Sequence, residues 1–408
     1  MNLILSNIGI IESAEIELNG LTVIAGNNDT GKSTVGKVAY SLTKAYQAFE
    51  VESEKEKIRV IQRYFRDIYT LMRKNVSFIE KPNFRRFFHK IDFFGFSDSK
   101  NINPLIKEGK EIIAAEGVED ETNKKIKDIF DKIELILHRE EETSDKIINS
   151  LTRIISSEFI DQITNFSSSN AKIEVREGQN QIINVLVKEG SISADVKDKI
   201  FPFESSIFIE TPLILSYSNS FEFEDETYHI EDLLKILKKS FVYNEKEELS
   251  ISNIINGKFY FNEEEDNFEF KIKGYNKPLN LNIKNVASGI KNFGLLQLLE
   301  RSGEFNKNLL LVIDEPEVHL HPDWQVEYAK VLVSLVKNGI KILIVSHSPY
   351  MIEALNKYSI KEGLEDKTKF YLAEKVGTGR AIIKDKTRDV DEIFEKLSKP
   401  FEKLIFEE

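Results

Sequence analysis

The sequence predicts an α/β protein with a mixed sheet, flanking helices, an antiparallel β portion and a helical insertion. Three observations support this prediction. An apolar strand pattern at 21–25 precedes a glycine-rich loop and a helical repeat of apolar residues. A strand–helix–strand pattern runs from 309 to 348, and strand patterns with a hairpin-like stretch begin at 171. Residues 50–165 are rich in Lys, Glu, Arg, Ile and Phe and poor in Gly and Pro, which predicts several helices.

Composition limits the classes of protein that the chain can represent. The 408 residues contain no cysteine, which excludes disulfides, iron–sulfur clusters and Cys-ligated zinc. No run of 18 apolar residues occurs, so no membrane span and no membrane partner are expected. The apolar start lacks a basic region and reads as a first strand, so we expect a cytoplasmic protein. The net charge of −12 means that any binding of nucleic acid depends on a local basic patch.

A glycine-rich loop follows the first apolar strand pattern, at residues 26–34 with the letters GNNDTGKST. It matches G-x-x-x-x-G-K-[ST], the phosphate-binding P-loop, and it lies between a strand pattern and a helix pattern as that motif requires. Glycines let backbone N–H groups turn inward on phosphates, and the following helix adds its positive N-terminal end. We expect Lys32 to reach the β- and γ-phosphates of ATP and Ser33 to ligate Mg²⁺. The residues expected to line this site are Gly26, Asn27, Asn28, Asp29, Thr30, Gly31, Lys32, Ser33 and Thr34.

An apolar strand pattern that ends in acids predicts the second half of the nucleotide site. Residues 309–314 read LLLVID, and Glu315 follows directly. A P-loop needs a carboxylate partner for its magnesium ion, and a strand ending in Asp is the usual form. We expect Asp314 to hold Mg²⁺ and Glu315 to orient and deprotonate the attacking water. An acidic pair after a strand can also cap a loop, but the upstream P-loop favours the catalytic interpretation.

Three histidines lie near these acids in the sequence. His347 ends the next apolar strand pattern, and we expect it to approach the γ-phosphate and Glu315 as a catalytic group. The alternative is a structural histidine at a strand end. His319 and His321 follow the acidic pair and resemble metal ligands, but no third ligand is evident apart from the acids already assigned. We expect these two histidines to shape a subunit interface.

Three segments together resemble a known family. The sequences GNNDTGKST, LLLVIDEPEVHLHP and ILIVSHSP are similar to the Walker A, Walker B with D-loop, and switch-histidine segments of ABC-type ATPase heads. They look most like the SMC, RecF and OLD-like branch. The pattern DEPExHLHP is typical of OLD-like AAA ATPases of bacterial antiphage defence systems. Too few residues follow His347 for the TOPRIM nuclease domain that some of these proteins carry.

The resemblance implies a signature motif that binds ATP held by a second subunit. The best match is the sequence ASGIK at 287–291, which opens an apolar helix pattern. Ser288 and Gly289 would offer a hydroxyl and a free N–H to the phosphate in trans, and Lys291 would add charge. The simpler alternative is that Ser288 only caps the helix. If the resemblance holds, the chain forms a homodimer or a higher oligomer through its ATP sites.

The resemblance also suggests how the chain is divided. We expect residues 1–45 to form the N-terminal lobe of the ATPase head, 46–170 a helical insertion and 171–408 the C-terminal lobe. The glutamine that such heads carry between their lobes cannot be assigned to Gln47, Gln162, Gln179 or Gln181. The strand-end segment 208–215, FIETPLIL, is a candidate for that lobe instead.

A basic stretch inside the insertion is the candidate contact for DNA or RNA. Residues 51–90 hold eleven Lys or Arg against five Asp or Glu, a local charge of +6. Phe84, Phe87 and Phe88 are interleaved with arginines, which suits phosphate contact and base stacking. A pair of amphipathic helices with Phe in its core explains the same pattern. Docking to an acidic partner protein is a third interpretation.

Two functions from different classes remain open at this stage. The first is an ATPase that couples nucleotide state to nucleic-acid processing, repair or antiphage defence. In that case a partner effector from a neighbouring gene, a nuclease or toxin, would supply any further activity. The second is an ATP-gated scaffold that sequesters or releases such a toxin or nuclease while hydrolysing ATP slowly. A transporter ATPase fits less well, because the signature segment departs from LSGGQ and the insertion is long.

Overall fold

The computed structural model describes residues 1–73, 102–115, 120–139, 141–165, 168–217, 227–239, 251–273 and 279–406, with a few positions between 82 and 89. The chain divides into two compact units. The first contains Met1–Gln47 and Leu151–Glu408, and the second contains Ala48–Ser150. The insertion expected over 46–170 is longer than the second unit. Its last part belongs to the first unit, where the Gly9 N–H donates to the Ile163 carbonyl at 2.8 Å.

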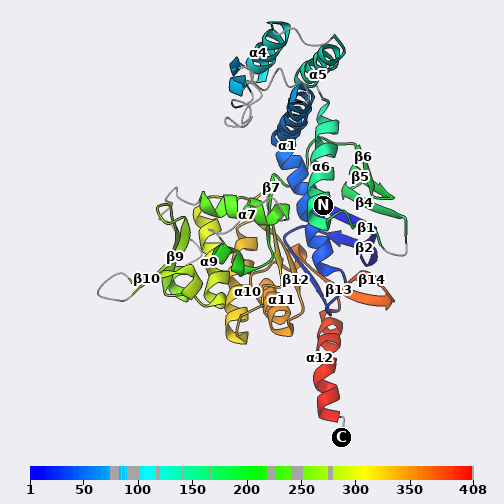
Figure 1. Cartoon of the computed structure of the whole chain (residues 1–408). Helices are drawn as coiled ribbons and strands as arrows, with labels where there is room; N and C mark the ends of the chain where they lie inside the picture. Colours follow the sequence, from blue (N-terminus) through cyan, green and yellow to red (C-terminus); the bar gives the residue numbers. More distant parts are fainter. Residues whose placement is uncertain are drawn as a thin grey trace. The chain divides into compact units, whose positions relative to one another are not determined.

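A large mixed sheet forms the centre of the first unit (Figure 1). Among the described residues its strand order is β6-β5-β4-β1-β2-β14-β13-β3-β12-β11-β7. The strands are β1 (Asn2–Ile8), β2 (Ile11–Glu17), β3 (Leu21–Gly26), β4 (Asn170–Glu177), β5 (Asn180–Lys188), β6 (Ser191–Val196), β7 (Ser205–Ile209), β11 (Leu309–Asp314), β12 (Lys341–Ser346), β13 (Thr368–Gly377) and β14 (Arg380–Asp385). This sheet confirms the mixed α/β fold class that the sequence predicts.

Parallel strands lie together at one end of the large sheet. β3 pairs in parallel with β12 on one side and β13 on the other, and β12 is followed by β11 and β7. Every residue of β3, β7 and β11 is buried, as expected for strands covered on both faces. The carboxyl ends of β3, β12, β11 and β7 therefore meet at one edge of the sheet, where ligands of open α/β sheets collect.

The antiparallel portion has two parts. β1, β2, β4, β5 and β6 pair antiparallel in the large sheet, and β13 forms a hairpin with β14. A separate sheet contains β8 (Gly257–Asn262), β9 (Asn267–Ile272) and β10 (Leu279–Asn282). The β8–β9 pair is antiparallel, which confirms the hairpin-like stretch expected after residue 171.

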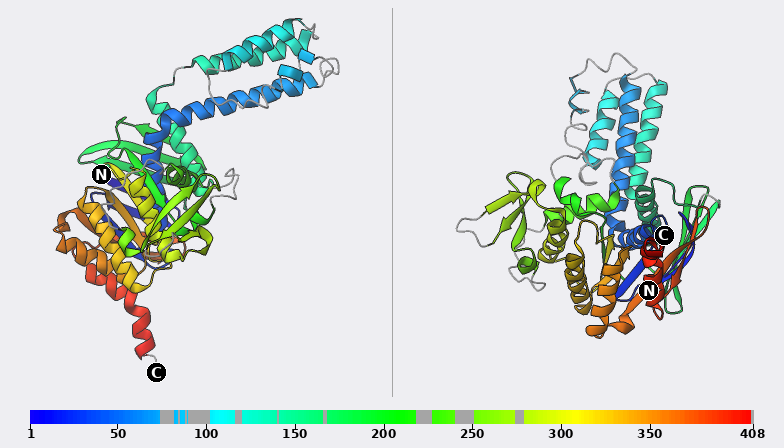
Figure 2. Two further views of the ribbon diagram at one scale, coloured as in Figure 1. Left: turned by 90° about the vertical axis from the view of Figure 1, so that its left-hand side faces the viewer. Right: turned by 90° about the horizontal axis from the view of Figure 1, so that it is seen from below.

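Helices cover both faces of the parallel strands. On one face, alternate core residues of β3, β11 and β12 pack with α9, α10 and α11. On the other face lies the first part of α1 (Lys32–Arg73), where a Cβ on Gly36 would come within 2.9 Å of Val312. The α10–α11 pair and the projecting C-terminal helix α12 are visible in Figure 2. The other helices of this unit are α7 (Tyr228–Lys238), α8 (Ile251–Ile254), α9 (Ser288–Arg301), α10 (Pro322–Lys337), α11 (Pro349–Lys361) and α12 (Val390–Phe406). The short 3₁₀ helices are η2 (Pro212–Tyr217), η4 (Ile283–Asn285) and η5 (Glu365–Lys367).

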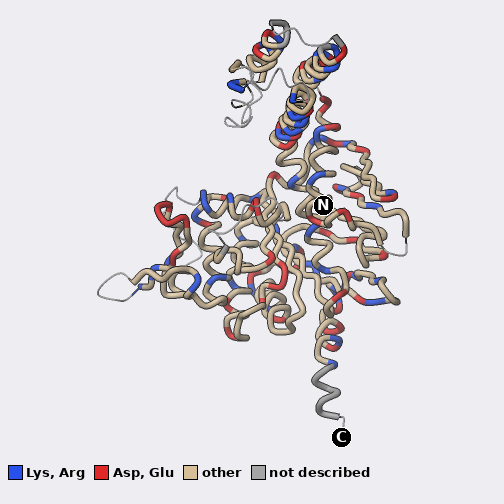
Figure 3. The backbone as a smooth tube through the Cα atoms, viewed as in Figure 1, with Lys and Arg blue, Asp and Glu red and all other residues tan. Residues whose placement is uncertain are grey.

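The second unit is mainly helical where it is described, with the non-helical residues 139, 141 and 142 between two of its helices. It contains the later part of α1, α4 (Ile102–Ala115), α5 (Asp120–His138) and the start of α6 (Thr143–Phe159). Its core includes Phe65 and Phe130, whose ring centroids lie 6.1 Å apart. Lys and Arg residues are interspersed with Asp and Glu residues along its described helices (Figure 3). Within the described residues of the chain, no helix combines the length and apolar composition that a membrane crossing requires.

The structure revises the nucleic-acid interpretation of the basic stretch. Phe87 is 2% exposed, and its ring packs on Phe65 in the core of the second unit, so it is not free to stack on a base. Arg85 and Arg86 are exposed. Phe84, Phe88 and three of the basic residues, Lys74, Lys81 and Lys90, lie outside the described residues. For Phe87, the interpretation as a core residue is therefore correct.

Candidate nucleotide-binding site

The P-loop connects β3 to α1, as the sequence predicts. Asp29 and Gly31 adopt positive φ angles of 57° and 80°, so the loop turns sharply before the helix begins at Lys32. Gly26 lies against the neighbouring strand, where a Cβ would come within 2.6 Å of the Ala373 carbonyl oxygen. The glycines of this loop are therefore required by backbone conformation and by close packing.

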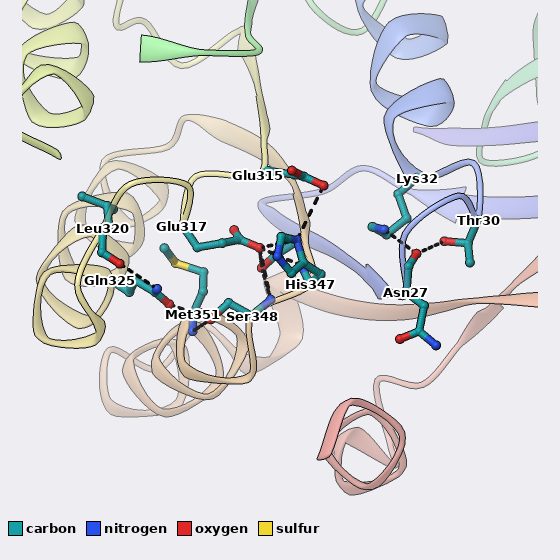
Figure 4. A network of polar contacts seen from close by, with 11 residues as sticks. Asn27, Thr30, Lys32, Glu315, Glu317, Leu320, Gln325, His347, Ser348 and Met351 are labelled. Carbon is teal, nitrogen blue, oxygen red and sulfur yellow. Dashed lines mark hydrogen bonds and ion pairs between the residues drawn. The ribbon is translucent and has the colours of Figure 1, made fainter. Parts of the chain in front are cut away.

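Lys32 lies in the predicted site near Asn27 and Thr30, across from Glu315 (Figure 4). Its side chain is 5% exposed, and its ammonium donates to the Asn27 carbonyl at 2.8 Å, which also accepts the Thr30 hydroxyl at 2.8 Å. Burial lowers the pKa of Lys32, and the nearby Glu315 and Asp314 carboxylates partly oppose that shift. The P-loop lysine and the acids at the end of β11, about 280 residues apart in sequence, therefore share one electrostatic environment.

Asp314 ends β11 and faces the P-loop. It is 8% exposed, and burial raises its pKa to about 6, while a hydrogen bond from Ser33 lowers it. Its Oδ1 atom is buried and has no hydrogen-bond partner among the described residues. Mg²⁺ prefers such oxygen donors, so a carboxylate with an unused buried oxygen beside a serine hydroxyl fits this ion. The sequence analysis predicts that Asp314 and Ser33 hold Mg²⁺, and the structure places these two side chains next to each other.

Glu315 adopts an unusual backbone conformation directly after the strand. Its φ angle is +46°, which is uncommon for a residue with a side chain. Its N–H donates to the Val345 carbonyl at 2.8 Å, which fixes the turn against β12. The turn leaves the Glu315 side chain 37% exposed, with Oε1 3.5 Å from Nδ1 of His347. The predicted base and the predicted switch histidine therefore lie side by side.

Glu317 has a position that the sequence analysis did not anticipate. Its side chain is only 4% exposed and points back to the end of β12. Oε1 accepts hydrogen bonds from the Ser346 hydroxyl at 2.8 Å, the His347 N–H at 2.7 Å and the Ser348 N–H at 3.1 Å. No pattern in the sequence singles out this role, because Glu317 is one of three acids between residues 314 and 317.

Glu210 is a second residue that the sequence analysis did not name. β7 runs parallel to β11 with Ile209 opposite Ile313, so Glu210 follows its strand beside Asp314. Its charge contributes to the raised pKa of Asp314. The Glu210 carboxylate lies 3.2 Å from Nε2 of His229. The segment 208–215 thus places a glutamate, Glu210, at the edge of the sheet where the nucleotide is expected to bind.

Nδ1 of His229 in turn lies 2.7 Å from the Glu158 carboxylate of α6. Burial lowers the pKa of His229, but its hydrogen bonds to Glu158 and Glu210 raise it overall. Glu158 and His229 are both fully buried, at 0% and 1% side-chain exposure. The buried His229 therefore lies between two carboxylates, and its contact with Glu210 helps to hold that side chain in position.

The signature segment forms the first turn of α9. Ala287 is the N-cap and provides no side-chain cap, so Ser288 is the first helical residue and not the cap. A Cβ on Gly289 would lie 3.0 Å from the His319 carbonyl, which places this turn against the loop that follows β11. Lys291 is 4% exposed; its ammonium donates to the Ser216 hydroxyl at 2.9 Å, and burial lowers its pKa.

His319 and His321, which resemble metal ligands in the sequence, each take a local position in the structure. Among the residues that the structure describes, no three His, Asp or Glu side chains are grouped so that they could hold a metal ion. His321 is instead the N-cap of α10, where its Nδ1 accepts the Asp323 N–H at 3.4 Å. His319 has a φ of +65° in the loop that contacts α9. The roles of these two histidines at a subunit interface stay a prediction.

The fold and this site define a P-loop ATPase. Residues 1–352 match the family model of the AAA ATPase domain. Because the match spans most of the 408 residues, the chain belongs to this family and is an ATPase. The predicted ATPase head is thereby confirmed, whereas the finer resemblance to OLD-like proteins stays a prediction. A search among curated proteins finds no match.

Solved structures that are similar to this chain include two SMC head domains. An SMC head domain from Thermotoga maritima is 10% identical, with a TM-score of 0.41 over 94% of this chain and 97% of that one. An SMC head with an extended coiled coil, from Pyrococcus furiosus and bound to the C-terminal domain of ScpA, is 10% identical, with a TM-score of 0.42 over 97% and 98%. The family match and the site geometry remain the basis of the assignment.

Proposed function

We propose that this ATPase closes as a dimer around two MgATP molecules. The observation that carries the proposal is the first turn of α9. Its N-cap residue Ala287 offers no side-chain cap, and the nearby Lys291 is a buried cation whose described partner is the Ser216 hydroxyl and not a carboxylate. A helix N-terminus with a buried cation favours an anion. A phosphate from the ATP of a second subunit would provide that anion through Ser288 and Gly289.

Within each site the residues have separate proposed roles. The backbone of 26–31 and Lys32 would bind the phosphates, and Ser33 and Asp314 would hold Mg²⁺, which supplies positive charge at the phosphate oxygens when bound. Glu315 would orient the attacking water and accept its proton, because its carboxylate is partly exposed beside the phosphate loop. His347 would stabilise charge that develops on the γ-phosphate.

Beyond hydrolysis, we propose that nucleotide state controls nucleic-acid processing or antiphage defence through an effector protein. The exposed Arg85 and Arg86 support contact with a phosphate backbone. Stimulation of ATP turnover by DNA or RNA, lost in the double variant Arg85→Glu/Arg86→Glu, is the expected result. If nucleic acid changes nothing and a partner protein copurifies stably, the ATP-gated scaffold is the better description.

The dimer is tested by trapping it. Glu315→Gln should keep ATP bound and double the mass of the protein in light scattering when MgATP is added, because turnover no longer resets the interface. Ser288→Arg in the same background should remain monomeric, because the large side chain blocks the phosphate in trans. A monomer in both variants at saturating MgATP contradicts the proposal.

A further inference from the structure

A single carboxylate oxygen organises the end of β12. Oε1 of Glu317 accepts three hydrogen bonds, from the Ser346 hydroxyl and from the N–H groups of His347 and Ser348. These three donors belong to consecutive residues at the point where the strand ends and α11 begins. Figure 4 shows Glu317 reaching this point from the loop after β11. The loop that contains the proposed base is therefore tied to the segment that contains the histidine.

The same oxygen also faces the imidazole ring of His347. Nδ1 lies 3.2 Å from Oε1 of Glu317 and 3.5 Å from Oε1 of Glu315, close enough for electrostatic attraction, although it makes no hydrogen bond to a described residue. An ionised carboxylate can only accept hydrogen bonds. A ring nitrogen this close to two carboxylates is therefore more stable with a hydrogen than without one. The other nitrogen of the neutral ring, Nε2, is then left as an acceptor.

A neighbouring residue shows that a charge is not needed to anchor this loop. Gln325 of α10 accepts the Ser348 hydroxyl at 2.6 Å and donates to the Leu320 carbonyl at 3.0 Å. A neutral amide thus links the same two segments. Burying a carboxylate costs more than burying an amide, and Oε2 of Glu317 is buried without a hydrogen-bond partner among the described residues. The charge of Glu317 is thus explained by the imidazole that it faces.

We infer that Glu317 is a positioning residue that holds His347 with Nδ1 protonated and fixes the ring beside Glu315. The inference rests on the proposed roles of Glu315 and His347 in ATP hydrolysis. Glu317 touches neither the nucleotide nor the attacking water in this assignment and acts only through the histidine. Partners of this kind, which orient a functional histidine from behind, typically contribute about 10- to 100-fold to activity.

A double-mutant cycle separates positioning from a general structural role. Glu317→Gln keeps the size of the side chain and an acceptor oxygen but removes the charge. We expect kcat to fall about 10- to 100-fold with KM changed by less than about twofold, because ground-state binding is untouched. In the His347→Gln background the same substitution should cost almost nothing more. Equal losses in both backgrounds, or wild-type turnover of Glu317→Gln, would refute the inference.

A matched control removes the neutral anchor of the same loop. Gln325→Leu breaks the contacts to Ser348 and Leu320 without touching His347. It should lower the melting temperature at least as much as Glu317→Gln while leaving kcat near the wild-type value. A kcat loss in Gln325→Leu as large as that in Glu317→Gln would mean that loop anchoring, and not histidine positioning, is what matters.

A spectroscopic measurement tests the inference independently of hydrolysis. With ¹⁵N-labelled histidine, the ring of His347, assigned by its loss in His347→Gln, should show a protonated Nδ1 in the nucleotide-free protein. Glu317→Gln should shift its ring resonances while those of His229, which contacts Glu158 and Glu210 instead, stay in place. A His347 ring protonated only on Nε2 overturns the inference even in an active ATPase. If that tautomer is found but His347→Gln hydrolyses ATP normally, the proposed catalytic role of His347 fails instead.

Discussion

The Lys32 ammonium donates to the carbonyl oxygen of Asn27, five residues earlier in the same loop. This contact closes the P-loop on itself and holds a buried cation where phosphate is expected to bind. A carbonyl dipole satisfies a cation less well than a phosphate does. We therefore expect Lys32 to leave Asn27 when nucleotide binds. Because the lysine is already buried in the free loop, the binding of MgATP does not have to remove water from it.

Replacing Lys32 tests the position of the phosphates. Lys32→Ala removes a charge-assisted hydrogen bond worth about 1.5–3 kcal/mol, so the Kd for MgATP should rise about 10- to 150-fold. Calorimetric titration measures this change. Lys369→Ala is the control, because that β13 lysine pairs with Glu17 at 3.0 Å, away from the loop. Equal affinity in wild type and Lys32→Ala would place the phosphates elsewhere.

Asp314 should make the stability of the metal-free protein depend on pH. Burial raises its pKa from 3.8 to about 6, so between these values the folded state binds more protons than the unfolded state. Stability conferred by Asp314 is therefore complete below about pH 4 and is lost as the pH rises to about 6, by up to about 3 kcal/mol. Asp314→Asn should remove this loss.

The measurement for Asp314 is urea unfolding of both proteins in EDTA at several pH values. The variant should gain stability over wild type between about pH 4 and pH 6 and keep a constant advantage above that range. Added Mg²⁺ should stabilise wild type more at high pH than at low pH, because the ligand must be ionised, and should not stabilise the variant. A stability difference that does not change with pH would count against the raised pKa.

Glu315→Gln should separate binding from chemistry. Removing the general base is expected to lower kcat by a factor on the order of 10²–10⁴, while the affinity for MgATP stays within a few-fold of wild type. Single-turnover hydrolysis and a binding titration give the two quantities. Glu353→Gln on α11, whose carboxylate pairs with Lys357 on the surface, is a matched change that should leave both unaltered. Full turnover in Glu315→Gln would remove this residue from the role of base.

Gly294 should be essential for the packing of α9 against the small sheet. A Cβ at this position would come within 2.5 Å of the Phe259 ring, which is fully buried. Gly294→Ala should therefore destabilise the protein by about 1–3 kcal/mol, even though alanine favours helices. Gly178→Asn is the control, since that turn faces open space and asparagine tolerates its positive φ of 58°. Thermal unfolding of the two variants should differ clearly.

The central elements could be predicted from sequence because their signals are local. The P-loop, the strand ending in Asp314 and the strand ending at Ser346 each combine an apolar run with chemistry at its end. The contacts of Glu317 and Glu210 could not be predicted in this way. They depend on strand register and on a turn with positive φ at Glu315, which bring residues far apart in sequence to one edge. Phe87 was ambiguous because an aromatic residue among arginines fits a core and a stacking surface equally well.

The pairing of β3 has a consequence for the synthesis of the chain. Leu21 pairs with Ile342 on one side and with Thr368 on the other, so the strand before the P-loop has no neighbour from its own end of the sequence. During translation this apolar segment must wait until the region around Thr368 has left the ribosome, and long-range parallel pairing of this kind forms slowly. We therefore expect the strand that leads into the P-loop to take its place only late in the synthesis of the chain.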